Sequence, residues 1–214
     1  MRPGQWLRRP SSLSSLPVKS GVAEESPGRV RSRERLLAAA AELTSVGGWA
    51  SLTMGRLAAD LGVSRQTVYN EVGSKAGLAE ALVLRETDKL AGTVGQIVAR
   101  HPGEAAEGVT AAFCHIVAAA RVNPLLKTVL GGQDGDELLS LITTRSQAVL
   151  ERAVTAVTPV LRAQYPERGL SEEEWSVFAE TFVRLLLSHV VQPGGPVERT
   201  ATSVRWVLGR MLDR

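Results

Sequence analysis

Cysteine is almost absent from this chain, which excludes two kinds of stabilising site. Cys114 is the single cysteine among 214 residues, so neither an internal disulfide nor a cysteine-based zinc site can form. This composition favours a reducing, intracellular setting, and we expect the protein in the cytoplasm. No uninterrupted apolar run approaches the ~18 residues of a membrane span, so we expect no membrane partner. The hydrophobic fraction of 44% is still enough for a substantial core.

Residue patterns typical of catalysis or metal binding are also lacking. Cys114 and His115 would suit nucleophilic chemistry, but adjacent helical residues point about 100° apart and do not face each other. The three histidines have no ligand spacing, and the acids at 172–174 are placed to complement a helix dipole. The glycine-rich stretches lack the lysine of a phosphate-binding loop. We therefore expect no enzyme activity, no cofactor and no metal site.

Charge is distributed unevenly along the chain. Residues 1–100 carry 14 Lys and Arg against 9 Asp and Glu, whereas residues 101–214 carry 11 against 13. The basic excess falls mostly near the N-terminus, as expected for a nucleic-acid-binding end joined to a neutral body. Residues 1–28 contain several prolines and serines without periodicity, which predicts a disordered tail. This tail is either a mobile basic arm that adds nonspecific DNA affinity or an overlong start.

A short helix is predicted at residues 54–61, within the stretch LTMGRLAADLGVSRQTVYNEVGSK. Thr53 has the position and chemistry of its N-cap. Gly62 suits the left-handed residue that ends such a helix. These signals predict a sharply bounded helix followed by a tight turn.

A second short helix is predicted at residues 65–70, directly after this turn. Ser64 has the position of its N-cap, and only Val68 within it is plainly apolar. Because so short a helix buries little surface, we expect its polar face to bind a partner. The layout is that of a helix-turn-helix, whose second helix enters the DNA major groove.

The rest of the chain shows helical periodicity, and no stretch alternates as a strand would. The predicted class is all-α, with the tail at 1–28, a three-helix DNA-binding head at 29–75 and a helical body at 76–214. Pro159 is expected to kink one body helix, and Ser171 with Glu174 forms a predicted capping box. Apart from the two short helices, we expect helices at 29–46, 75–100, 104–121, 136–163, 171–191 and 197–212.

From Arg31 to Lys75 the chain resembles the DNA-binding domain of the TetR family of transcriptional regulators. The resemblance lies in the segments RERLLAAAAELTSVGGWASLT and LAADLGVSRQTVYNEVGSK, which have the family's alanine, Gly-Val-Ser, Tyr and Ser-Lys spacing. It implies a three-helix head, a ligand-binding helical body and a homodimer. Asn70-Glu71-Val72 departs from the family, which commonly has an aromatic residue or His followed by Phe. Glu71 would repel phosphate, so we exclude it from the predicted contacts.

The resemblance also implies which residues contact DNA. It assigns phosphate contacts to the starts of the second and fourth helices and base contacts to the helix at 65–70, where Arg suits guanine and Gln suits adenine. At the basic start of the first helix, a phosphate would relieve charge that opposes the helix dipole; a solvated basic face is the alternative. The predicted DNA-binding residues are Arg31, Thr53, Ser64, Arg65, Gln66, Thr67, Tyr69, Asn70 and Lys75.

Apolar side chains in the body predict a ligand pocket between the helices that begin near 104 and 136, with the long helix after the head as a wall. Because these side chains are mostly aliphatic, we expect a small hydrophobic effector, such as a lipid-like or acyl compound. Ordinary core packing is the alternative for each of them. The predicted pocket residues are Phe113, Cys114, Ile116, Val117, Asn123, Leu126, Ile142, Arg145, Val149 and Phe178.

The helix at 171–191 has an apolar face that predicts either core packing or a contact between protomers. The resemblance implies dimerisation through the last two helices. Two-fold symmetry would also place two heads on half-sites about one DNA turn apart. The predicted interface residues are Trp175, Phe182, Leu186, His189, Val204 and Leu208.

Together these expectations form one hypothesis: a homodimeric repressor that a hydrophobic effector releases from a palindromic operator in double-stranded DNA. One alternative is a helical carrier that sequesters a small molecule and no longer binds DNA specifically. Another is a nonspecific DNA-coating protein that uses the basic tail. The first predicts ligand binding without DNA binding, and the second predicts equal affinity for any duplex.

Overall fold

The computed structural model consists of helices joined by mostly short connections. Within the described residues every regular element is helical, which confirms the predicted all-α class. The tail predicted at residues 1–28 lies almost wholly outside them. The structure describes residues 27–123, 126, 136–143, 146–192 and 195–212.

The head begins with α1 (Pro27–Ser51), which loses helical geometry at Gly48, where φ is 77° and ψ is 161°. The interruption lies two residues after the predicted end of this helix at residue 46, and one further turn follows it. In α2 (Met54–Leu61) the N-cap prediction is confirmed, because the Thr53 side chain accepts a backbone N–H of the first turn. Gly62 ends α2 in the left-handed conformation, with φ of 67°.

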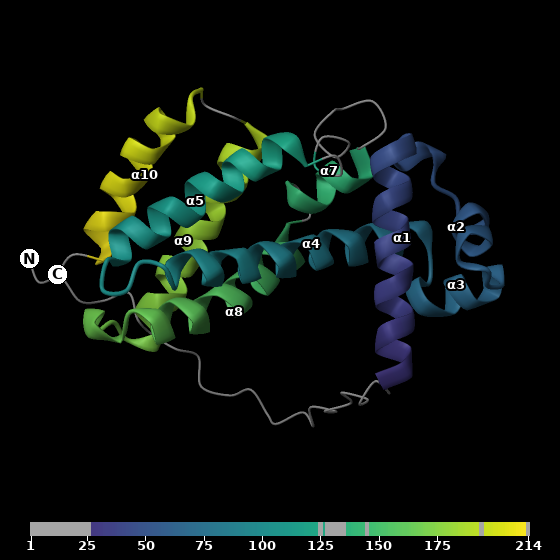
Figure 1. Ribbon diagram of the computed structural model, residues 1–214, viewed down its shortest axis with the longest axis horizontal. Coiled ribbons are helices and arrows are strands. Elements are labelled where there is room, and N and C mark those ends of the chain that lie inside the picture. Colours follow the sequence, from purple (N-terminus) through teal and green to yellow (C-terminus); the bar gives the residue numbers. More distant parts are fainter. Residues whose placement is uncertain (1–26, 124–125, 127–135, 144–145, 193–194, 213–214) are drawn as a thin grey trace, which may run out of the picture.

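The third helix of the head, α3 (Arg65–Val72), leads directly into the long helix α4 (Lys75–Val98). Ser64 caps α3 as predicted, and the helix runs two residues beyond the expected end. Ser74 caps α4 in the same way, through a hydrogen bond from the backbone of its first turn. In Figure 1, α4 leaves the head and runs through the middle of the body.

The body surrounds the second half of α4 with α5 (Ala105–Val122), α7 (Asp136–Ile142), α8 (Gln147–Gln164), the short 3-10 helix η1 (Pro166–Arg168), α9 (Glu172–Val191) and α10 (Val197–Leu212). Both α5 and α8 pack on α4, while α9 packs on α8 and α5. α10 packs mainly on α5. The predicted capping box of α9 is present, with Ser171 and Glu174 each bonded to the other's backbone.

Two hydrophobic clusters divide the core of the protein. The head cluster joins α1, α2 and α3 to α4 as far as Leu82, and it also contains Leu138 and Leu141 of α7. The body cluster begins on α4 at Ala91. The boundary predicted between residues 75 and 76 stays a prediction, but the buried side chains of the head extend well beyond it.

The prediction of one helix from 136 to 163 is wrong, because α7 and α8 are separate helices. Leu138 and Leu141 of α7 pack into the head cluster, whereas α8 packs into the body. Helical periodicity continues across both segments, so the pattern cannot show that their partners differ. α8 continues through Pro159, where we expected a kink.

α5 is the one described helix that is long and apolar enough by composition to cross a membrane. Half of this 18-residue segment is buried inside the protein. Its apolar side chains, including Val109, Phe113 and Ile116, belong to the body cluster. The apolar composition therefore matches the place of α5 in the core.

Candidate DNA-binding face and internal cavity

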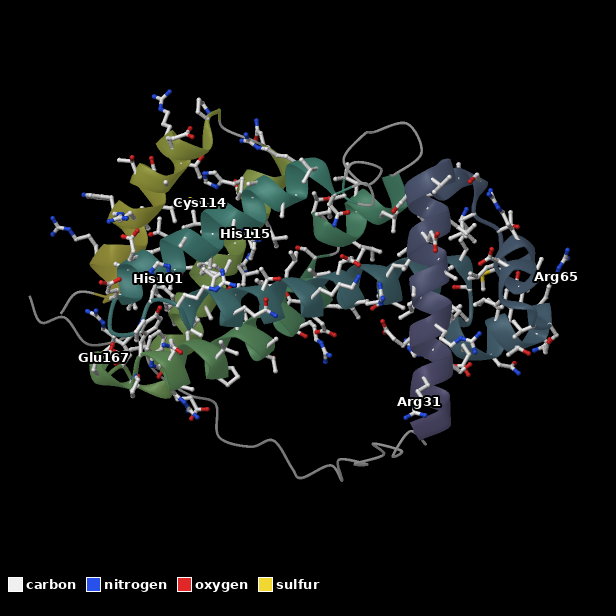
Figure 2. The ribbon with its side chains drawn as sticks, in the orientation of Figure 1. Arg31, Arg65, His101, Cys114, His115 and Glu167 are labelled. Atoms are coloured by element: carbon white, nitrogen blue, oxygen red, sulfur yellow. The ribbon has the colours of Figure 1, made fainter. Side chains whose placement is uncertain are left out.

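The polar side of α3 is exposed at the outer edge of the head. Val68 and Val72 are buried in the head cluster, which turns the opposite side of the helix to solvent. Figure 2 shows Arg65 projecting at the end of the molecule farthest from the body. The five side chains of α3 predicted to contact DNA are all exposed: Arg65, Gln66, Thr67, Tyr69 and Asn70.

Two of these side chains have neighbours that restrict their positions. Gln66 Nε2 donates to Asn70 Oδ1 at 2.8 Å, one turn along the helix. Arg65 lies against α2, where a Cβ added to Gly55 would stand 2.9 Å from its Nε and Nη2 atoms. Because glycine has no Cβ, position 55 leaves room for the guanidinium group of Arg65. No local pattern signals this contact, since it joins two helices.

Ser64 and Thr53 serve as helix caps as well as predicted DNA contacts. Ser64 Oγ accepts the backbone N–H of Thr67 at 3.0 Å and lies 2.9 Å from the Thr67 hydroxyl. Thr53 Oγ1 accepts the backbone N–H of Arg56 at 3.1 Å. These bonds satisfy amides that have no partner within their helices. Both caps are exposed, and their contacts with phosphate stay predictions.

Lys75 joins the start of α4 to the end of α1. Its Nζ donates to the backbone oxygen of Trp49 at 3.0 Å and lies 4.9 Å from the centre of the Trp49 ring. The indole is buried, so this pair fixes the ammonium group at the start of α4. An ammonium group has three donors, and the predicted phosphate contact of Lys75 needs one of the others.

Arg31 and Arg33 belong to the same basic stretch of α1 but have different surroundings. Arg31 is exposed, and in Figure 2 it projects near the N-terminal end of α1. Arg33 turns toward α3, and its Nη1 donates to the backbone oxygen of Glu71 at 3.2 Å. The last carbonyls of a helix lack partners and carry partial negative charge. Arg33 therefore holds the end of α3, a role that the sequence prediction missed.

An apolar cavity of about 70 Å³ lies where α4, α5, α7, α8 and α9 meet. Leu82 and Leu138 line it and also belong to the head cluster. Glu86 and Thr87 of α4 are the polar side chains on the described wall. The cavity is therefore in contact with the core of the head and with the helices of the body.

Three of the predicted pocket residues line this cavity, namely Ile116, Leu126 and Val149. Leu186, which we predicted at the dimer interface, also lines it. Three other predicted pocket residues are buried in the body cluster but do not line the cavity: Phe113, Val117 and Phe178.

The polar residues predicted for the pocket lie elsewhere on the described structure or outside it. Asn123 ends α5, and its Oδ1 accepts the backbone N–H of Leu126 at 3.2 Å. Cys114 is half-buried on α5. Arg145 and the side chain of Ile142 lie outside the described residues. Glu86 and Thr87 were not among the predicted pocket residues, because we expected α4 only as a wall of the pocket and named no residue on it.

Comparison with known proteins assigns both parts of the chain to one family. Residues 36–82 match the family described as bacterial regulatory proteins, tetR family, and residues 104–210 match the bacterial tetracyclin repressor, C-terminal domain. The chain is 31% identical over 182 residues to the HTH-type transcriptional regulator AlkX of Mycobacterium tuberculosis (strain ATCC 25618 / H37Rv), with 85% of each chain covered. The chain belongs to the TetR family of transcriptional regulators.

Solved structures of TetR-family proteins have the same fold. The TetR family repressor AlkX from Dietzia sp. strain DQ12-45-1b, implicated in biodegradation of n-alkanes, superimposes with a TM-score of 0.75 at 26% identity, covering 87% of this chain and 95% of that chain. The TetR-family repressor FadR of Thermus thermophilus, solved with lauroyl-CoA, gives a TM-score of 0.56 at 22% identity, covering 82% and 92%. The second likeness shows the fold alone.

The side chains predicted for a TetR-family dimer interface are instead mostly buried within the protomer. His189 is partly buried, and its ring meets Phe113 edge-on at 5.3 Å. The prediction therefore selected the core-facing sides of α9 and α10, because an apolar stripe looks the same for a core and for an interface. The buried residues are Trp175, Phe182, Leu186, Val204 and Leu208.

Cys114 and His115, the pair considered for nucleophilic chemistry, lie on α5 of this TetR-family regulator, where Figure 2 labels both. Cys114 is half-buried whereas His115 is exposed. Burial raises the pKa of the Cys114 thiol, which favours the unreactive protonated form. Among the described residues no three His, Cys, Asp or Glu side chains are grouped to hold a metal ion.

Proposed function

We propose that this TetR-family regulator is a homodimeric, cytoplasmic repressor that a small hydrophobic effector releases from a palindromic operator. The exposed face of α3 carries the DNA-binding part of this proposal. Its five polar side chains are exposed on α3. Ser64 caps the start of α3, Arg33 bonds a carbonyl at its end, and Thr53 caps the neighbouring helix α2. A helix of this kind fits the major groove, where Arg and Gln distinguish bases.

The position of the cavity supports regulation by an effector. Leu82 and Leu138 belong to the head cluster and line the cavity, so a molecule that enlarges the cavity displaces core side chains of the head. On α4, Arg85 also bonds Glu34 of α1, with Nε 2.6 Å from Oε1. Packed cores respond to such displacement by discrete shifts. The effector acts only as far as it prefers the arrangement that does not bind DNA.

A hydrophobic effector matches the walls of the cavity. Aliphatic side chains from five helices line it, and its two described polar residues are Glu86 and Thr87 of α4. The Dietzia relative is implicated in biodegradation of n-alkanes, which supports an aliphatic effector here. We therefore expect a flexible hydrocarbon chain rather than a polar metabolite.

A homodimer would present two heads to two half-sites of a palindrome. The described surface of α10 includes Trp206, which is 67% exposed, and that of α9 includes Val177, which is 55% exposed. Large exposed apolar side chains are common at contacts between protomers. We propose these sides of α9 and α10 for the interface in place of the buried faces. Sedimentation of the purified protein should give a dimer, and Trp206→Glu should shift it toward monomer.

A gel-shift titration with the DNA that flanks its own gene tests the central proposal. We expect one preferred site, protected on both half-sites in a footprint, and an affinity that falls steeply between 50 and 200 mM salt. Addition of n-octane should release the DNA. Equal affinity for every duplex would support the nonspecific DNA-coating alternative. Octane binding without any DNA binding would support the carrier, and either result would refute the repressor.

A further inference from the structure

Gly55 is a glycine inside a helix whose backbone does not require one. It lies in the first turn of α2 and is half-buried. Glycine is less favourable than alanine in a helix, because it loses more backbone freedom on folding. Gly55 is not among the glycines with positive φ, so its backbone conformation is open to any residue. What distinguishes glycine at this position is therefore the space that its missing side chain leaves.

The guanidinium group of Arg65 occupies that space. A Cβ added to Gly55 would stand 2.9 Å from Nε, 2.9 Å from Nη2 and 3.0 Å from Cζ of Arg65, and these are the three atoms nearest to it. Because the three distances are nearly equal, the flat face of the guanidinium group lies over Gly55. The N–H bonds of the group lie in its plane, so they point past the glycine.

This contact leaves the donors of Arg65 available to DNA. A guanidinium group has five N–H donors in a fixed fork, and no described residue shares a hydrogen bond or an ion pair with that of Arg65. Arg65 is exposed, and Figure 2 shows it at the outer end of the head. It is also the first residue of α3, and the first residues of a recognition helix contact base edges.

We propose that Gly55 is a specificity-determining residue for operator binding, because it lets α2 hold the guanidinium plane of Arg65 in the orientation that reads guanine. This inference rests on the operator binding proposed above and concerns a residue that acts through Arg65. A bidentate contact with guanine needs two donors in fixed positions. A long side chain that is already restricted also loses less rotamer freedom when it binds.

A methyl group at position 55 should separate stability from recognition. The added Cβ would be closer to the guanidinium group than an ordinary van der Waals contact, so one of the two must move. Helix α2 is fixed by its N-cap and by its buried side chains, whereas the end of an exposed arginine is free to rotate. Gly55→Ala should therefore be at least as stable as the wild-type protein, while Arg65 loses its orientation.

Binding titrations with the operator and its single-base-pair variants test the proposal. Arg65→Ala should lose about tenfold of discrimination at one G·C pair, and Gly55→Ala should lose roughly threefold at the same pair. Discrimination at the other base pairs should be unchanged. In the double variant, Gly55→Ala should add nothing to the loss caused by Arg65→Ala, because the group that the glycine positions is gone.

Gly92→Ala is the matched control for these measurements. Gly92 is an exposed glycine inside α4, and a Cβ added there would meet no atom within 4 Å. This variant makes the same change of helix propensity without touching Arg65, so it should keep the wild-type discrimination at every base pair. Urea denaturation of all four variants establishes that a loss of discrimination does not come from unfolding.

A second measurement uses the protein without DNA. NMR relaxation of the Arg65 Nε–H group, at mildly acidic pH where its proton exchanges slowly with water, reports how far the guanidinium group is restricted. We expect a lower order parameter in Gly55→Ala than in the wild-type protein, and a wild-type value in Gly92→Ala. The same order parameter in all three proteins would overturn the proposal, since the glycine would then not hold the arginine.

Several outcomes of the binding titrations would also overturn the proposal and leave an operator-binding repressor intact. These are full discrimination by Gly55→Ala, an equal loss in the Arg65→Ala background, and uniform weakening at every base pair. A lower stability of Gly55→Ala would overturn it as well, because the methyl group would then disturb α2 itself. Failure of the repressor proposal is distinguishable, since the wild-type protein would show no preferred site, while the relaxation measurement would still test the contact.

Discussion

The head and the body of this protein are both helical, but they are held together differently. The head depends on two helices of eight residues each, α2 and α3, whose ends are fixed by capping side chains. The body depends on longer helices around large aromatic side chains. Phe113 of α5 and Phe182 of α9 meet edge-on there, with ring centres 5.8 Å apart. Local bonds define the head, and contacts between distant segments define the body.

This difference explains how one part can signal to the other. A short, capped helix keeps its shape when its neighbours move, so the head can move as a unit. The body core encloses a cavity whose wall includes Leu82 and Leu138 of the head cluster. Arg85, paired with Glu34, and Asp88, paired with Arg152, tie α4 to α1 on one side and to α8 on the other. α4 is thus the element on which both parts act.

The largest expected effect comes from removing an aromatic ring from the body core. Phe113→Ala should lower the free energy of unfolding by about 3–5 kcal/mol, the usual range for such a truncation. Phe113 is fully buried and touches rings of α9. Urea denaturation measures the loss, and Val177→Ala on the exposed side of α9 is the control. A loss no larger than that of the control would contradict the role we give to aromatic packing.

The next effect should appear in DNA binding. Gln66→Ala should cost about 1–3 kcal/mol of discrimination at one base pair. Tyr69→Phe and Lys75→Ala should instead weaken binding to all sequences, and the lysine variant should lower the salt slope by about one. Gel shifts with single-base operator variants separate these outcomes. Urea denaturation is the control for Lys75→Ala, because that change also removes the contact with Trp49. Uniform weakening by Gln66→Ala would contradict base reading.

Removing an N-cap serine from one helix of the head and from one helix of the body tests whether the two parts are independent. Ser64→Ala and Ser171→Ala each delete a side-chain acceptor for a first-turn amide, and each should cost about 1 kcal/mol of stability. Only the Ser64 variant should also weaken operator binding, because α3 carries the DNA-binding face. Denaturation curves and gel shifts on both proteins test this. Equal weakening by Ser171→Ala would show that the head is not a separate unit.

The smallest expected effect is a pH dependence of stability that comes from one tyrosine of the body. Burial raises the pKa of Tyr165 from 10.0 to about 12, and its hydroxyl donates to the backbone oxygen of Val98 at 3.3 Å. The unfolded chain therefore loses this proton first, and stability that is complete below pH 10 falls as pH rises toward 12. The loss between pH 9 and pH 11 is about 1 kcal/mol. Urea curves should show this loss in the wild-type protein relative to Tyr165→Phe; parallel curves would refute it.

The head could be predicted from the sequence almost completely, because its signals are local. Thr53, Gly62 and Ser64 bound their helices through the chemistry of one or two turns, and each acts as predicted. Arg33 and Gly55 were missed, since their partners belong to other helices. Arg31, Arg33 and Arg35 look alike in the sequence, and no local pattern shows that Arg33 is the one that contacts α3.

The body contains the features that local patterns leave undecided. Its helices at 171–191 and 197–212 were predicted at nearly their observed bounds, yet the face of α9 that appeared suited to a partner is buried by α5 and α8. Apolar periodicity shows which side of a helix is buried. It does not show whether that side is buried by the same protomer or by a partner. The same limit produced the single helix predicted across α7 and α8.

The sequence by itself determined the helical class, the caps and the polar face of α3, because hydrogen bonds within a few residues control these features. Only the tertiary structure decided that α7 packs with the head and that Leu82 and Leu138 are shared between the head core and the cavity. These features depend on which distant segments meet, and burial of apolar surface is non-directional. Many pairings satisfy the same pattern, and close packing of the folded chain selects one of them.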